Sequence, residues 1–292
     1  MHIPVLLKEV IANLNPKPNE NFVDCTFGFG GHAVAILEKT GPNGKVLGVE
    51  WDREKLKIKN EKLKIDRLVL INDSYANLRE IVERENFGPI NGVLLDLGIS
   101  SWDFENSGRG FSFQKDEPLD MRYSEKQLLT AKEIINKWPE EELERIFREY
   151  GQERFAKNIA SNIVKIRRQK LIGTTFQLVE IIKKSFPKSY KFGKIHVATR
   201  TFQALRIAVN NELENLKNVL PQALEVLEKG GRVAVISFHS LEDSIVKKFF
   251  KTQAQNNNLQ ILTKKPVVAS AIEIKENPKA RSAKLRVAQL NN

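Results

Sequence analysis

Short apolar runs alternate with charged stretches along the first hundred residues of the chain. Four runs rich in Val, Leu and Ile lie at residues 21–27, 45–50, 67–73 and 92–98. The segments between them, such as DREKLKIKNEKLK, are highly charged and have the length of a helix. Strands that alternate with helices in this way are typical of a parallel sheet covered by helices. We therefore predict an α/β fold that binds its ligand at the carboxyl ends of the strands.

The alternation stops after the fourth strand. Residues 104–122 form a loop that contains Gly and Asp, and a helical region follows. Pro139 opens one predicted helix, whose apolar residues recur at helical spacing: Leu143, Ile146, Phe147 and Tyr150. Further helices are predicted at 154–170, after a cap at Thr174 or Thr175, and at 201–213. Strands resume at 231–238 and 280–290, so we predict a helical domain inserted into the sheet domain.

A glycine-rich turn follows the first strand. The stretch DCTFGFGGHA (24–33) fits the dinucleotide-binding spacing through Gly28, Gly30 and Ala33. Glycine lets the backbone approach a ligand closely, and the start of the next helix offers free N–H groups. Glu50, at the end of the second strand, stands where an acid that binds ribose hydroxyls belongs. This combination indicates a nucleotide-like cofactor but does not separate NAD from S-adenosylmethionine.

The fourth strand ends in DLGISS, which carries a second candidate acid. Asp96 in this position would face the reacting end of a bound cofactor, and the alternative is that it caps a turn or helix. No Lys-Ser/Thr pair follows the glycines, which disfavours simple triphosphate binding. The sequence has no P-C-x-x-C either, which excludes a zinc deaminase signature.

The composition of the chain indicates which kind of binding partner and which cellular compartment to expect. The chain has 292 residues, with 47 Lys and Arg against 36 Asp and Glu, and its net charge of +11 favours a polyanionic partner. Its one cysteine, Cys25, excludes an internal disulfide framework and a cysteine-rich zinc site. The first residues lack the apolar run of a signal peptide, and no apolar run of 18 residues occurs. We therefore expect a cytoplasmic protein without a membrane segment.

Eight motifs spread along the chain resemble one family. They are HIPVLLKEV, DCTFGFGGH, LLDLGISS, RGFSFQKDEPLDMR, YGQERFAKNIA, ATRTFQALRIAVNNEL, GGRVAVISFHSLED and NPKARSAKLR. In this order they resemble the bacterial 16S rRNA cytosine-N4 methyltransferases, which use S-adenosylmethionine. The resemblance implies a Rossmann-like class I methyltransferase fold with an inserted all-helical substrate-recognition domain. It implies a core at 1–104 and 208–292, an RNA-recognition insert at 105–207, and methylation of the decoding-centre cytidine conventionally numbered 1402 within the small ribosomal subunit.

The resemblance also implies ligand positions. The residues that match the family's cofactor site are Gly30, Gly31, His32, Glu50, Tyr75, Asp96 and Asp103. Two of them depart from the family pattern. Glu50 stands where Asp is usual and reaches one methylene further, and Asp103 stands where Gln is common. Because a carboxylate cannot donate a hydrogen bond unless it is protonated, the contact at Asp103 is the less secure of the two.

Methyl transfer to an exocyclic amine requires alignment and a proton acceptor. Cytosine N4 is a weak nucleophile because its lone pair is delocalised into the ring, and an oxygen that accepts its N–H would assist attack and then take the proton. The candidates are Asp96 and the adjoining Ser100 and Ser101. His239, after the fifth strand, would contact the target base or a phosphate, or instead cap a helix.

Candidate RNA contacts lie in the loop, in the insert and near the end of the chain. Arg109 would meet a phosphate while Phe111 and Phe113 stack on a base, and the alternative for the two phenylalanines is a structural anchor. Candidate backbone contacts are Arg200, Arg206, Lys279, Arg281, Lys284 and Arg286. Two other functions share some of these features, a nicotinamide oxidoreductase and an RNA-binding assembly factor with a vestigial cofactor fold. A homodimer is compatible with the sequence but not indicated by it.

Overall fold

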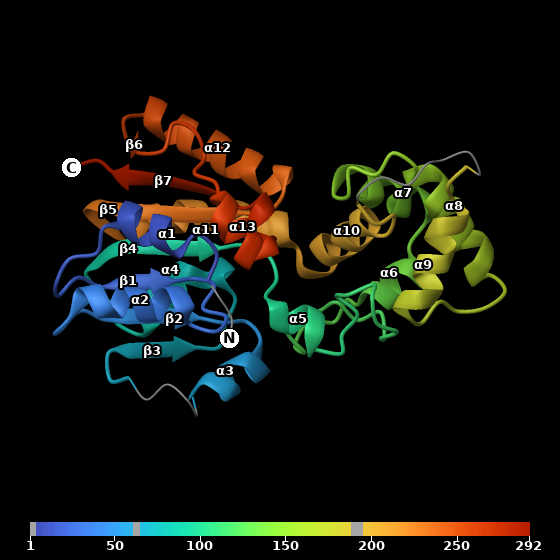
Figure 1. Ribbon diagram of the computed structural model, residues 1–292, viewed down its shortest axis with the longest axis horizontal. Helices are drawn as coiled ribbons and strands as arrows, with labels where there is room; N and C mark the ends of the chain where they lie inside the picture. The colour runs from blue at the N-terminus through green and yellow to red at the C-terminus, as the bar shows by residue number, and fades with distance from the viewer. Residues whose placement is uncertain (1–3, 61–64, 188–194) are drawn as a thin grey trace. The chain divides into compact units, whose positions relative to one another are not determined.

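The computed structural model describes residues 4–60, 65–187 and 195–292 of the chain. The chain divides into two compact units, Met1–Gly98 with Leu213–Asn292, and Ile99–Glu212 (Figure 1). The second unit begins before residue 105 and ends after residue 207, so its bounds are wider than those predicted for the insert. The difference has a physical cause, because Ile99, Phe104 and Val209 all pack in the apolar core of the second unit.

The first unit contains one seven-stranded sheet with the order β3-β2-β1-β4-β5-β7-β6 (Figure 1). Its strands are β1 (Phe22–Asp24), β2 (Val46–Val49), β3 (Leu68–Ile71), β4 (Ile90–Asp96), β5 (Leu227–Ser237), β6 (Leu259–Ile261) and β7 (Lys284–Leu290). Strands β1 to β5 pair in parallel, and β7 pairs antiparallel with both β5 and β6. The predicted α/β class is confirmed, while the short strand β6 is absent from the prediction.

Helices cover both faces of this sheet. One face packs against the first two helices, α1 (Leu7–Leu14) and α2 (Gly31–Thr40), and the other packs against α4 (Leu78–Arg84), α11 (Glu212–Glu225) and α12 (Ser240–Gln255). Alternate residues of a strand point to opposite faces, so Leu94 lies in one core and Val93 and Leu95 in the other. The unit also contains α3 (Arg53–Asn60), α13 (Ala271–Glu276), and the 3-10 helices η1 (Tyr75–Asn77) and η2 (Pro278–Ser282).

The second unit is helical in its described residues. Its helices are α5 (Ser101–Glu105), α6 (Ala131–Lys137), α7 (Glu140–Glu149), α8 (Ala156–Arg167), α9 (Thr175–Lys184) and α10 (Thr199–Asn210). Thr174 caps α9 as predicted, because its side chain accepts from Gln177 N. The predicted apolar stripe after Pro139 is also confirmed, with Leu143, Ile146 and Phe147 fully buried.

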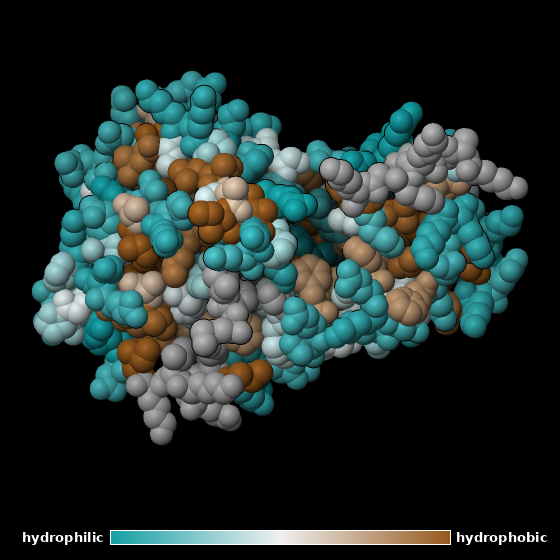
Figure 2. Space-filling view, in the orientation of Figure 1, coloured by the Kyte–Doolittle hydropathy of each residue, from teal (hydrophilic) through white to brown (hydrophobic). Residues whose placement is uncertain are grey.

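The visible surface is mainly hydrophilic. Hydrophilic side chains make up most of the visible face of each unit, with smaller apolar areas between them (Figure 2). None of the helices in the described ranges combines the length and the apolar character needed to cross a membrane.

Candidate active site

Three acidic residues lie at the carboxyl ends of neighbouring strands in the first unit. Asp24 is the last residue of β1, Glu50 follows β2 directly, and Asp96 is the last residue of β4. Strand β1 pairs in parallel with β2 on one side and with β4 on the other. The three carboxyl groups therefore meet at one edge of the sheet, where α/β folds of this kind bind ligands.

The glycine-rich turn joins β1 to α2 at the same edge. Gly30 is the N-cap of α2 and adopts a left-handed φ of 74°, which glycine takes without strain. A Cβ atom at Gly30 would lie 2.6 Å from the ring of Phe27, and one at Gly31 would lie 2.2 Å from Pro4. At Gly28 the nearest atom would be 3.7 Å away. Gly30 and Gly31 are thus required by close packing within the protein, whereas a Cβ at Gly28 would make only an ordinary van der Waals contact.

The turn also presents backbone donors. The first N–H groups of a helix lack acceptors within the helix, so the start of α2 at Gly31 and His32 suits an anionic or polar ligand group. Glu50 is 9% exposed and braces the turn, since its two oxygens accept from Gly28 N at 2.9 Å and from Asp52 N at 2.8 Å. A carboxylate is an acceptor only, which is the chemistry that ribose hydroxyls require of a partner. The bonds from Gly28 N and Asp52 N hold the side chain of Glu50, which is one methylene longer than the Asp usual in the family.

Asp96 is the acid whose surroundings most resemble a ligand site. Its Oδ2 lies 3.7 Å from Nδ1 of His32, while its buried Oδ1 has no hydrogen-bond partner among the described residues. Burial raises the pKa of Asp96 well above its usual value, and the charges of Asp24 and Glu242 raise it further. The Asp96 side chain as a whole is 21% exposed, so a bound cofactor or substrate can reach its carboxyl group although Oδ1 itself is buried without a partner in the described ranges.

Asp24 is a site residue that the sequence analysis missed. It is 1% exposed, and its Oδ1 accepts from Thr26 N at 3.1 Å. Burial raises the pKa of Asp24 to about 7, the bond from Thr26 opposes this shift, and the charge of Glu50 adds to it. Thr26 also accepts from Asp96 N at 2.6 Å, which links β1 to β4. The signal was present, because Asp24 ends a strand as Asp96 does.

Asp24→Asn is expected to raise the free energy of unfolding by about 3 kcal/mol near pH 8, with a gain that shrinks toward pH 5. The folded state keeps the Asp24 proton up to about pH 7, whereas an unfolded carboxyl group loses it near pH 3.9. Between these values the unfolded state binds fewer protons, so Asp24 makes stability fall as pH rises. Urea unfolding at several pH values measures the difference, and an Asp24→Asn effect that is constant with pH would contradict the assignment.

Two further predicted residues lie at this edge. Tyr75 begins η1 directly after β3 and is half-buried against the core. His239 follows β5 and is the N-cap of α12, with Nδ1 3.5 Å from Glu242 N and Nε2 3.1 Å from Glu242 Oε1. Of the two roles open to His239, the structure therefore displays the helix cap. The carboxylate of Glu242 in turn accepts from the backbone of Phe238 and His239.

In the second unit, Ser100 and Asp103 bind each other. Ser100 donates from both its N and its Oγ to Asp103 Oδ2, each at 2.8 Å, and the pair forms the cap of α5. Asp103 is 1% exposed. These contacts give both residues a structural role at the start of α5. Ser101 is the first residue of α5, and its side chain lies outside the described part of the structure.

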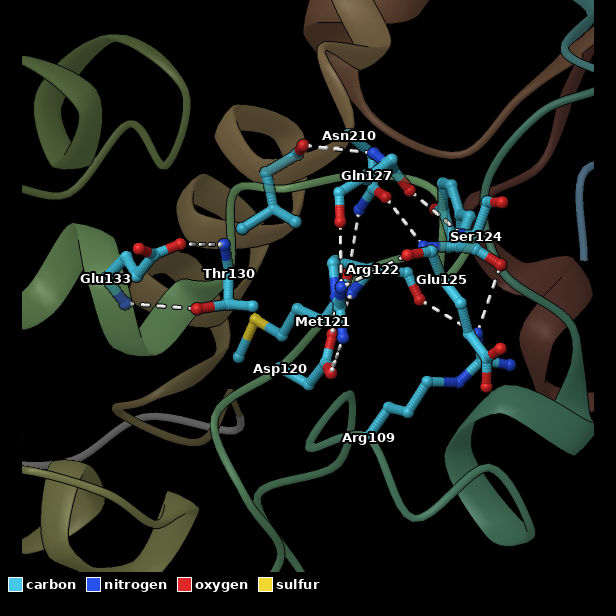
Figure 3. Close-up of polar contacts among 12 residues, drawn as sticks. Arg109, Asp120, Met121, Arg122, Ser124, Glu125, Gln127, Thr130, Glu133 and Asn210 are labelled. Carbon is cyan, nitrogen blue, oxygen red and sulfur yellow. Dashed lines mark hydrogen bonds and ion pairs between the residues drawn. The ribbon is translucent and has the colours of Figure 1, made fainter.

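Arg109 belongs to a hydrogen-bonded loop, drawn in Figure 3. Its Nη1 donates to the carbonyl oxygens of Arg122 and Tyr123, both at 3.0 Å, and its guanidinium lies 5.8 Å from the ring centre of Trp102. Arg122 forms a bidentate pair with Asp120, with both bonds at 2.7 Å (Figure 3). This pair lowers the pKa of Asp120 against the opposing effect of burial. Arg109 thus holds the loop in shape, where the sequence analysis expected a phosphate contact.

The two phenylalanines of RGFSF differ in their surroundings. Phe111 is 4% exposed and stacks on Tyr123 with 5.6 Å between ring centres. Phe113 is half-buried, stacks on His196 at 4.5 Å and meets the edge of Phe202 at 5.5 Å. Phe111 is a core residue of this unit, which corresponds to the anchoring alternative.

The basic residues predicted to contact RNA fall into two groups, those paired with an acidic residue and those with exposed side chains. Arg206 is buried against Glu212, and Lys284 and Arg286 both contact Asp243. Because their charges are already paired, these three are poor candidates for phosphate contacts. Arg200 near the start of α10 and Arg281 in η2 have exposed side chains. Their exposure leaves Arg200 and Arg281 available for phosphate contacts. The charge pattern of the sequence could not distinguish these exposed cations from the paired ones.

Comparison with known proteins identifies the family. The chain matches the profile described as the MraW methylase family over residues 1–291. It is 45% identical to the ribosomal RNA small subunit methyltransferase H of Symbiobacterium thermophilum, with 98% of this chain and 95% of that protein aligned. It is 44% identical to the protein of the same name from Halothermothrix orenii, over 99% and 98% of the two chains. A solved structure of a putative rRNA methylase from Clostridium thermocellum aligns over 100% of this chain and 99% of its own at 13% identity, with a TM-score of 0.49. The chain belongs to the MraW methylase family.

Proposed function

We propose that the protein transfers a methyl group from S-adenosylmethionine to N4 of one cytidine in the small-subunit ribosomal RNA, the decoding-centre position numbered 1402. The observation that carries the proposal is the partly buried carboxyl group of Asp96, which lies at the strand edge that also holds the glycine-rich turn. The small-subunit rRNA specificity is taken from the names of the 44–45% identical relatives.

S-adenosylmethionine, when bound, supplies a methyl carbon activated by its sulfonium sulfur. The residues that would hold this cofactor are the start of α2 at Gly31 and His32, the carboxylate of Glu50, and Tyr75. They fit it chemically, because helix N–H groups suit a carboxylate and a carboxylate such as that of Glu50 accepts hydrogen bonds from hydroxyl groups. The carboxyl group of Asp96 accepts an N–H of the target amine, which returns electron density to N4 and prepares removal of its proton.

The target cytidine must leave its stack to reach the methyl group, which costs a few kcal/mol. Basic residues of the helical unit are proposed to offset this cost by holding the RNA backbone, with Arg200 as the best available candidate. Ser100, Asp103 and Arg109 support the loop that follows β4, and we assign them no direct part in the chemistry.

Binding calorimetry separates this function from its two rivals. The wild-type protein is expected to bind S-adenosylmethionine and not NAD, and the Glu50→Ala variant is expected to bind the cofactor at least about tenfold more weakly. Preferential binding of NAD would favour an oxidoreductase. Unchanged RNA binding without any cofactor binding would favour the assembly factor.

Arg200→Ala is expected to weaken binding to small-subunit RNA and to lower the salt dependence of binding by about 0.7 in the slope of log K against log salt. The reason is that one neutralised phosphate fewer releases one counterion fewer. The matched control is Lys137→Ala, since Lys137 is already paired with Glu133 at 2.9 Å. Equal slopes for wild type and Arg200→Ala would remove Arg200 from the proposed interface.

A further inference from the structure

The two ring nitrogens of His32 have different partners. Nε2 lies 3.0 Å from the carbonyl oxygen of Val5. A carbonyl oxygen only accepts, so Nε2 must carry the hydrogen of this bond. In a neutral imidazole the other nitrogen, Nδ1, then has a lone pair instead of a hydrogen. The bond to Val5 thus fixes which nitrogen of His32 faces Asp96.

Nδ1 and Asp96 Oδ2 are 3.7 Å apart, and the two side chains are 7% and 21% exposed. A lone pair on Nδ1 opposite an ionised carboxylate would be repulsive, whereas one proton between them makes the contact attractive. Contacts of this kind are often long in a free enzyme and shorten when substrate binds.

The surroundings of Asp96 favour a pair without net charge. Asp24 at the end of β1 and Glu242 on α12 both act on Asp96 electrostatically, and Glu50 after β2 acts on Asp24 in the same way. Together with burial, these carboxyl groups make an ionised Asp96 unfavourable. A single proton shared with His32 leaves the pair neutral, whichever of the two atoms holds it.

We infer that Asp96 Oδ2 and His32 Nδ1 hold one proton between them, and that this pair takes up the proton which cytidine N4 loses. The second clause rests on the proposed function. As the N–H bond of the methylated amine breaks, its proton binds the carboxyl group of Asp96, and the shared proton moves fully onto His32 Nδ1. The carboxyl group thereby gains one proton and gives up another, and the imidazole becomes a cation. His32 is a positioning residue, since it acts through Asp96.

Nitrogen NMR of the histidine side chains tests the shared proton without any activity. A nitrogen with a proton and a nitrogen with a lone pair differ widely in chemical shift. We expect Nε2 of His32 to be protonated at all pH values, and Nδ1 to shift toward the lone-pair value in Asp96→Asn. The exposed His196 is the internal reference, and the His32→Gln spectrum assigns the signals. A lone-pair shift at Nδ1 that Asp96→Asn leaves unchanged would overturn the shared proton.

Kinetics test the second clause of the inference, the movement of a proton from Asp96 to His32, which we call the relay. His32→Gln keeps a donor for Val5 but cannot accept a proton, so its kcat near pH 7 is expected to fall about 10²-fold with little change in KM for the cofactor. The loss should diminish at alkaline pH. Without His32, Asp96 accepts the proton only when it is itself ionised, and its raised pKa therefore shifts the acidic limb of the pH–rate profile to higher pH. His32→Asn should show the same rescue. A loss that is equal at every pH would overturn the relay while leaving the methyltransferase proposal intact, and an inactive wild type would overturn that proposal alone.

Discussion

Asp96→Asn is expected to lower kcat for methyl transfer by about 10²- to 10⁴-fold, the usual contribution of a positioned proton acceptor. Asparagine has the shape of aspartate and still offers an oxygen to a bound donor, but it cannot take the proton of the methylated amine. Binding of S-adenosylmethionine is expected to change much less than kcat. Thermal stability should be kept or raised, because the substitution removes a buried acid that lies near Asp24 and Glu242.

Steady-state kinetics with saturating cofactor, together with calorimetry, separate the two roles open to Asp96. Asp66→Asn serves as the control, since Asp66 is an exposed acid of the same unit. If cofactor affinity fell as far as kcat/KM while kcat at saturation stayed normal, Asp96 would be a cofactor ligand without a part in the chemistry.

Asn210→Ala is expected to lower the free energy of unfolding of the helical unit by about 3 kcal/mol. Asn210 is fully buried at the end of α10. Its Nδ2 donates to the carbonyl oxygen of Met121 at 2.7 Å, and its Oδ1 accepts from Tyr123 N at 2.8 Å (Figure 3). Removal of the side chain leaves two backbone groups without partners. Met121 adds to the cost, because it holds a left-handed φ of 61° that these contacts help to maintain.

Chemical unfolding measures the loss, and Asn218→Ala on α11 is the control. The Asn218 side chain is exposed, so its removal should change stability by no more than about 0.5 kcal/mol. Similar values for the two variants would show that the loop is held by other contacts.

The apolar pattern predicted the sheet because its central strands are largely buried on both faces. The continuous runs at β2, β4 and β5 are the direct result of that burial. The prediction missed β6, whose three residues pair only at the sheet edge, and it placed the unit boundary between residues 104 and 105, inside α5. The boundary depends on which core Ile99 and Phe104 join, and local periodicity carries no information about that choice.

The site was predictable where strand ends determine it and not where side chains pair with one another. Glu50 and Asp96 follow from the rule that ligands bind at the carboxyl ends of parallel strands, and Asp24 would have followed from the same rule. Ser100 and Asp103 look like active-site residues in the sequence but satisfy each other in the cap of α5. Such pairings depend on backbone geometry after folding, which motif spacing does not specify.

The central claim is tested most directly by nucleoside analysis of RNA methylated by the wild-type protein. Small ribosomal subunits that lack the modification would be incubated with labelled S-adenosylmethionine, and the digested RNA would be examined by mass spectrometry. The account predicts N4-methylcytidine at a single site in the decoding region, formed far more slowly by Asp96→Asn. A methyl group on a ring carbon or on another base, or no transfer although cofactor and subunits both bind, would contradict it.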